Sequence, residues 1–83
     1  MYNTEVMEFE DLIKISFKRL YLMGYKENDI EVIDNSENMD QKLALKNLLN
    51  DGYIEPTKSH KTYKISSSYY NFLKNENEIF GAR

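Results

Sequence analysis

Hydrophobic residues recur every three or four positions over the first third of the chain, which predicts a long amphipathic helix. This helix is expected from about Glu5 to Met23, with Asn3 or Thr4 as its N-cap and Gly24 as its end. Its core-facing stripe contains Phe9, Leu12, Ile13, Phe17, Leu20 and Met23, with Ser16 among them. Ile15 and Leu22 lie beside this stripe, seven residues apart, and fit either a broadened core edge or a dimer contact.

A second amphipathic pattern predicts a helix from about Glu37 to Asn50 or Asp51, ending at Gly52, with Asn35 and Ser36 available as caps. Its expected core residues are Ala44, Leu45, Leu48 and Leu49, with Gln41 at the edge.

Residues 27–34, between the two helices, have an ambiguous pattern. The spacing of Ile30 and Ile33 suits a short helix, whereas Val32 and Ile33 together also suit a short strand. We predict the short helix.

After Gly52 the pattern changes to short runs of β-branched and aromatic residues, which predicts paired strands at 53–55 and 62–65. Pro56 belongs at a strand end or edge because it cannot donate a ladder hydrogen bond, and residues 57–61 form the tip between the strands. Ser66 is a suitable N-cap for a last helix, with residues 75–83 expected to fray. One face of this helix carries Tyr69, Phe72, Leu73 and Phe80.

Charge is divided unevenly along the chain. Residues 1–40 carry four basic and ten acidic side chains, a net charge of −6, and residues 41–83 carry seven basic and four acidic ones, a net charge of +3. Between Lys42 and Lys74, six lysines face only Asp51 and Glu55. The basic second half favours an anionic partner more than the total of −3 does.

The length and composition limit the kind of protein. Eighty-three residues predict a single domain, 1–83, of a size that often gains stability by dimerising. The chain lacks cysteine, which excludes disulfides and thiolate metal sites. It shows neither a membrane-spanning apolar run nor a signal peptide, so we expect a cytoplasmic protein.

The residue content of the chain argues against an enzyme or a metal-binding protein. With one histidine, His60, and no Gly-rich phosphate loop, we expect no enzymatic activity and no cofactor. Ser59 and His60 are adjacent, which is poor geometry for a nucleophile and its base. The acidic residues between Asp29 and Asp40 lack the glycine and closing glutamate of a calcium loop, so we expect no metal.

From Leu45 to Leu73 the chain resembles the winged helix-turn-helix superfamily. The resemblance rests on two leucines before a glycine, on a Gly-aromatic-Ile step, and on a Tyr-x-Ile strand leading into a closing helix. These positions are Leu45, Leu48, Gly52, Tyr53, Ile54, Tyr63, Ile65, Ser66, Phe72 and Leu73. A further resemblance, to small bacterial and prophage proteins called YjcQ-like, rests on residues 27–30, 52–54 and 63–64. Tyr69 departs from the family, which has a small residue in the closing helix.

The resemblance implies an α+β, mainly helical fold with three helices, a two-stranded wing hairpin and a C-terminal helix. It also implies that the third helix, the one expected from about Glu37 to Asn50, and the wing bind duplex DNA, with lysines on phosphates and carboxamides on base edges. The residues expected to bind DNA are Lys42, Lys46, Asn47, Asn50, Lys58, His60, Lys61 and Lys64, with Gln41 as a further candidate that also fits the core edge. The function expected first is that of a transcriptional regulator of phage or mobile-element type, acting as a homodimer.

Met39 and Leu43 favour a different function. They lie opposite the core residues of the third helix, on the face that a DNA-reading helix keeps polar. Three explanations fit them: burial against the second helix, expected at residues 27–34, contact with a protein partner, or contact with thymine methyl groups of DNA. The alternative function is therefore a winged-helix module that binds protein and not DNA. Its expected partner or dimer contacts are Ile15, Leu22, Met39, Leu43, Tyr69 and Phe80.

Four tyrosines, at positions 53, 63, 69 and 70, also suit stacking on RNA bases. On half-buried strands and helices such residues more often belong to the core, and we expect that role here.

Overall fold

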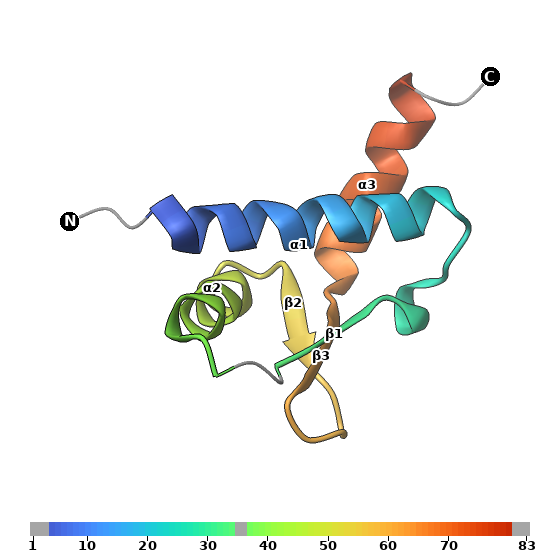
Figure 1. Ribbon diagram of the computed structural model, residues 1–83. Helices are drawn as coiled ribbons and strands as arrows, with labels where there is room; N and C mark the ends of the chain where they lie inside the picture. The colour runs from blue at the N-terminus through green and yellow to red at the C-terminus, as the bar shows by residue number, and fades with distance from the viewer. Residues whose placement is uncertain (1–3, 35–36, 81–83) are drawn as a thin grey trace.

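The protein is a mainly helical α+β domain in a computed structural model that describes residues 4–34 and 37–80 (Figure 1). Three α-helices and a three-stranded antiparallel sheet account for most of it. In chain order the elements are α1 (Thr4–Leu22), the 3₁₀ turn η1 (Glu27–Asp29), β1 (Glu31–Ile33), α2 (Met39–Asn50), β2 (Ile54–Pro56), β3 (Thr62–Ile65) and α3 (Ser67–Phe80). This confirms the expected α+β, mainly helical class. The order of elements is compatible with a winged helix, but the sheet has three strands where two were expected.

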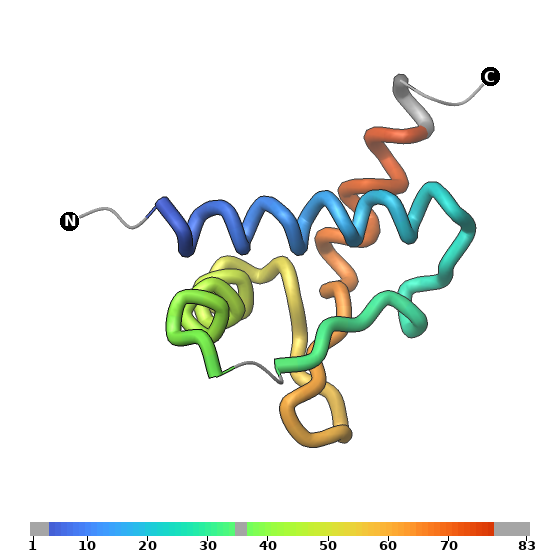
Figure 2. Tube along the Cα trace, viewed as in Figure 1, coloured from blue at the N-terminus to red at the C-terminus, as the bar shows by residue number. Residues whose placement is uncertain are grey.

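The sheet has the order β1-β3-β2, so the last strand in sequence lies in the middle. Val32 is opposite Tyr63 and Glu55 is opposite Lys64, both in antiparallel pairs. Helix α1 lies across one side of α2 and the sheet, α3 crosses α1, and the β2–β3 tip projects from the opposite end (Figures 1 and 2). Pro56 is the last residue of the edge strand β2, as predicted.

The prediction of a short helix at residues 27–34 is wrong for most of the segment. A single 3₁₀ turn is followed by the strand β1, which was the alternative. The strand forms because β3 offers an unpaired edge and because Ile30, fully buried, fixes the chain against the core. Ile65 N–H donates to the Ile30 carbonyl at 2.9 Å. The winged helix-turn-helix prediction required two helices between α1 and the hairpin, at residues 27–34 and 37–50. In the described part of this region, α2 is the only α-helix.

The core-facing side of α1 is rotated from the predicted stripe. Phe17 is buried and Ile13 and Leu20 are partly buried, but Leu12 and Met23 are 57% and 70% exposed. Conversely, Val6 is buried and Tyr21 packs on the core, although neither was predicted. The rotation arises because α1 packs against α2 and α3 together and not against one helix.

Two glycines end the helices in the way predicted. Gly24 and Gly52 have φ angles of +98° and +83°, a conformation open to residues without a side chain. After α1, the Gly24 and Tyr25 N–H groups donate to the Tyr21 and Leu20 carbonyls. The same pair of bonds follows α2, where Gly52 and Tyr53 donate to Leu49 and Leu48. Both ends are therefore Schellman motifs.

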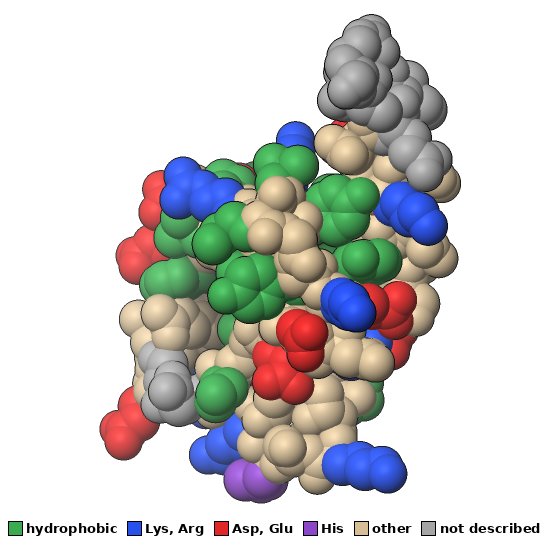
Figure 3. Space-filling view, turned by 90° about the vertical axis from the view of Figure 1, so that its right-hand side faces the viewer, with side chains coloured by type: hydrophobic (Ala, Val, Ile, Leu, Met, Phe, Trp, Pro, Cys, Tyr) green, Lys and Arg blue, Asp and Glu red, His purple; other side chains and the backbone are tan. Residues whose placement is uncertain are grey.

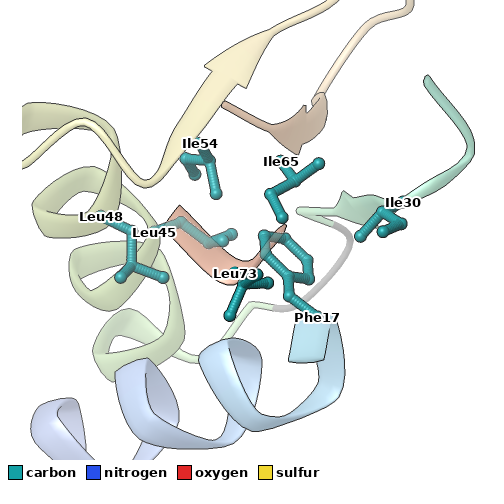
Figure 4. Packing of buried hydrophobic residues seen from close by; sticks show 7 residues of the cluster. All are labelled: Phe17, Ile30, Leu45, Leu48, Ile54, Ile65 and Leu73. Carbon is teal, nitrogen blue, oxygen red and sulfur yellow. The ribbon is translucent and has the colours of Figure 1, made fainter. Parts of the chain in front are cut away.

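The central core joins all three helices to the sheet (Figure 4). Its buried members are Phe17, Ile30, Leu45, Leu48, Ile54, Ile65 and Leu73. The predicted core positions of α2 are confirmed, since Ala44, Leu45 and Leu48 are buried and Leu49 packs against the cluster. The N-cap of α2 is Asn38, whose side chain accepts from the Asp40 and Gln41 N–H groups. The predicted caps Asn3, Asn35 and Ser36 lie outside the described residues.

Helix α3 begins after Ser66, which caps it as predicted by accepting a hydrogen bond from the Tyr69 N–H at 3.1 Å. The helix continues to Phe80 through residues where fraying was expected. Leu73 is buried and Tyr69 partly buried, whereas Phe72 is 56% exposed, so the predicted face is only partly a core face. The side chain of Phe80 lies outside the described part of the structure.

Candidate interaction surfaces

The tip of the β2–β3 hairpin is held by its own hydroxyl groups. Thr57 Oγ1 donates to the Thr62 carbonyl at 3.0 Å and accepts from the Ser59 N–H at 3.1 Å. Lys61 adopts a left-handed conformation, with φ +56°, which closes the turn. The tip exposes the side chains of Lys58, His60 and Lys61. In Figure 3 the histidine and neighbouring basic side chains lie at the lower end of the molecule.

Lys64 is held in a charged cluster behind the tip. Its Nζ lies 3.0 Å from Glu27 Oε2 and 3.6 Å from Glu55 Oε1, and it also donates to the Ile65 carbonyl. Ser67 Oγ donates to Glu27 Oε2 at 2.7 Å, and its N–H donates to Glu55. The Ser67 hydroxyl, followed by Lys64, lowers the pKa of Glu27. Because two carboxylates surround Lys64, it contributes little positive potential to a DNA surface.

Two more of the predicted DNA-binding side chains have partners within the chain. Lys42 Nζ lies 3.3 Å from Asp34 Oδ1, and Asn47 Nδ2 donates to Glu10 Oε2 at 2.9 Å. The second contact shows that Asn47 faces α1 and not the outer side of α2. Lys46 and Asn50, by contrast, are exposed.

The outer side of α2, defined as Met39, Leu43, Lys46 and Asn50, combines apolar and polar groups. These residues follow at intervals of four, three and four, so they form one stripe along the helix. Met39 is 74% exposed and Leu43 is 45% exposed. The explanation of burial against another helix is therefore wrong for this chain.

The predicted DNA surface is thus divided into separate parts. Lys58, His60 and Lys61 lie at the hairpin tip, Lys46 and Asn50 lie on the last two turns of α2, and the remaining three side chains have other partners. Gln41 is partly buried, and it lines the same groove as Leu45. This agrees with the alternative that placed Gln41 at the edge of the core.

A groove between α1 and β1 is a feature that the sequence did not predict. It is open to solvent, about 330 Å³ in volume, and lined mainly by apolar side chains. The lining residues are Phe9, Leu12, Ile13, Ser16, Phe17, Leu20, Glu31, Val32, Ile33, Gln41 and Leu45. The groove is formed because residues 31–33 are a strand and not a helix. Since the sequence pattern predicted a helix there, it did not predict the groove.

The tyrosines pack mainly within the molecule. Tyr53 and Tyr69 make an edge-to-face contact with ring centroids 4.9 Å apart, and Tyr21 and Tyr70 make another at 5.4 Å. Lys14 Nζ lies 4.1 Å above the centre of the Tyr53 ring. Burial raises the pKa of Tyr69. These contacts favour the core role that we expected for the tyrosines.

Comparisons with family models, curated proteins and solved structures found no match. In residues 4–34 and 37–77, no three acidic or histidine side chains gather closely enough to hold a metal ion. The described helices include none long and apolar enough to cross a membrane.

Proposed function

We propose that this chain is a protein-interaction module on a winged-helix-like scaffold, and that the outer side of α2 is its binding surface. The observation that carries the proposal is the exposure of Met39 and Leu43 on one stripe of α2. A helix that enters a DNA major groove presents polar groups at these positions, whereas protein partners bury Met and Leu side chains.

The charges near this stripe support a protein partner and define its chemistry. Its N-terminal half lies beside Glu37 and Asp40, which would repel phosphates. Its C-terminal half carries Lys46. A matching partner segment presents apolar side chains to Met39 and Leu43 and an acidic group to Lys46, as amphipathic helices do when they dock on a helical surface.

Leu43→Asp tests this surface because the exposed position tolerates the change without loss of the fold. We expect affinity-tagged wild-type protein to retain a defined protein from cells of its source organism, and the variant to retain at least tenfold less of it. Quantitative mass spectrometry measures the difference, with circular dichroism as the check on folding.

Asn75→Asp, an exposed change of the same charge on α3, is the matched control and should retain the partner like the wild type. Equal retention by all three proteins would exclude the outer side of α2 as the binding surface.

Duplex DNA binding is the second candidate, supported by the exposed cations Lys46, Lys58 and Lys61 with His60 between the last two. Lys46, Lys58 and Lys61 have no ion pair among the described residues. Three phosphate contacts would make the logarithm of the binding constant fall with the logarithm of salt concentration with a slope of about −3.

Fluorescence anisotropy with a labelled duplex at several salt concentrations tests this second function. If DNA is the ligand, Lys58→Glu with Lys61→Glu should weaken binding to all sequences alike and should reduce the slope to about −1. Leu43→Asp adds a negative charge beside Lys46, so it should weaken DNA binding if the outer side of α2 contacts the DNA. Comparing this variant with the Lys58→Glu, Lys61→Glu variant shows whether the outer side of α2 or the hairpin tip binds the duplex. Binding that is absent at tens of micromolar protein in low salt would rule DNA out.

A further inference from the structure

The side of α1 that faces away from the core carries a second regular pattern. Glu8, Leu12, Ile15, Arg19 and Leu22 follow one another at intervals of four, three, four and three residues. At 100° per residue they form a narrow stripe, which lies opposite the buried residues Val6 and Phe17. Leu12, Ile15 and Leu22 are 57%, 50% and 59% exposed. In Figure 1 the upper side of α1 is turned away from α2 and the sheet.

The spacing of this stripe is that of a helix–helix seam. Alternating steps of three and four residues keep side chains on the line along which two helices touch in a coiled coil. Three apolar side chains on a solvent-facing seam are unfavourable for an isolated monomer. Of the two roles considered for Ile15 and Leu22, the core edge is wrong, since both are half or more exposed.

The charges on the stripe are arranged symmetrically about its centre. Glu8 precedes the apolar pair by four residues, and Arg19 follows it by four. In the described part of the chain neither has an ion pair. A helix laid antiparallel against an identical helix, with the two-fold axis between residues 13 and 14, exchanges position 8 with 19 and position 12 with 15. The part of the stripe from position 8 to position 19 is therefore complementary to itself in one orientation.

We propose that a second copy of this chain covers α1, with the two α1 helices antiparallel about a two-fold axis. Leu12 packs against the partner subunit's Ile15 in the centre of the interface. Glu8 pairs with the partner subunit's Arg19 on each side of it, and Leu22 lies beyond these pairs at both ends. A parallel arrangement would instead place like charges together, with Glu8 beside Glu8 of the partner subunit.

The area available makes this a weak dimer. The self-complementary part of the stripe spans 11 residue steps, or about 17 Å of helix, and such a seam is smaller than the standard protein interface. We expect a dissociation constant on the order of 10–100 μM. The surface is separate from the outer side of α2, so the dimer and the proposed function stand or fall independently.

Charge reversal tests both the dimer and its orientation. Glu8→Arg and Arg19→Glu each replace two attractive pairs by two repulsive ones, and each should weaken association by about tenfold or more. The double variant restores opposite charges in the antiparallel dimer and should return the dissociation constant to within about threefold of the wild-type value. Analytical ultracentrifugation over a concentration series up to about 0.5 mM measures all four proteins, and circular dichroism confirms that each is folded.

Leu12→Ser with Ile15→Ser removes the apolar centre and should leave a monomer throughout this range. Leu43→Asp, on the other surface, should dimerise like the wild type. A monomeric wild type at 0.5 mM would overturn the proposal. Failure of the double reversal to recover association, or loss of association through Leu43→Asp alone, would overturn the antiparallel α1 arrangement.

Discussion

Leu48→Ala is expected to lower the free energy of unfolding by about 2–5 kcal/mol, the range found when a buried leucine is truncated. Leu48 is fully buried in the core cluster, and its helix α2 packs against α1 and β2. The cluster joins all three helices to the sheet, and these elements cannot all move inward to fill the space left by removal of the Leu48 side chain. A loss of this size is a large part of the stability of a small domain.

Urea denaturation followed by circular dichroism gives the two free energies for this comparison. Leu12→Ala is the matched control, because the same atoms are removed from a side chain that is 57% exposed. Its effect should stay within about 0.5 kcal/mol when measured at a concentration where the protein is monomeric. A Leu48→Ala effect below about 1 kcal/mol would mean that the packing around α2 is loose enough to close the space left by the side chain.

Ser66→Ala is expected to lower the free energy of unfolding by about 1–3 kcal/mol, for two separate reasons. The hydroxyl of Ser66 accepts the Tyr69 N–H and so caps α3, a contact typically worth about 1 kcal/mol. It also donates to the Gly52 carbonyl in the turn after α2. Since Ser66 is only 3% exposed, removing the hydroxyl takes a hydrogen bond from a site with little access to water.

The same urea titration measures this change, with Ser16→Ala as the control. Ser16 is an exposed serine within α1, where alanine should be neutral or stabilising by a few tenths of a kcal/mol. If Ser66→Ala and Ser16→Ala were equally mild, the hydroxyl of Ser66 could not be the link between α3 and the turn after α2.

Elements specified by local sequence were predicted well. The glycines that end α1 and α2, the cap at Ser66 and the two strands of the hairpin all depend on residues close to one another in the chain. In the same way, the buried face of α2 follows from the spacing of Ala44, Leu45 and Leu48. In each case the residues that determine the element are neighbours along the chain or one helical turn apart.

The predictions that failed concern elements whose structure depends on residues far away in the sequence. The strand β1 exists because β3, some thirty residues later, presents an edge for it, and residues 27–34 alone contain no trace of that edge. The rotation of α1 has a similar origin, since the helix touches both α2 and α3 and its buried side is the compromise between them. Local periodicity could not distinguish Leu12 from Val6 because both lie within reach of an apolar stripe.

For the candidate surfaces, the exposure of some side chains was predicted correctly, but the partners that other side chains find in distant elements were not. Lysines at the hairpin tip are exposed as expected, but Lys42 and Lys64 meet carboxylates from other elements. Counting charge along a segment treats each lysine as free, whereas Asp34 and Glu27 are brought to these lysines by β1 and η1. Asn47 was likewise assigned to the outer side of α2 without knowledge of where Glu10 would lie.

The central place of β3 in the sheet has a consequence for the order in which the chain folds. The β2–β3 pair closes a loop of only residues 57–61, whereas the β1–β3 pair encloses residues 34–61. Closing the longer loop costs more chain entropy before any contact is gained. We therefore expect the hairpin and α2 to form the folding nucleus, with β1 joining after the rate-limiting barrier. The groove beside α1 would then be completed last during folding and opened first during unfolding.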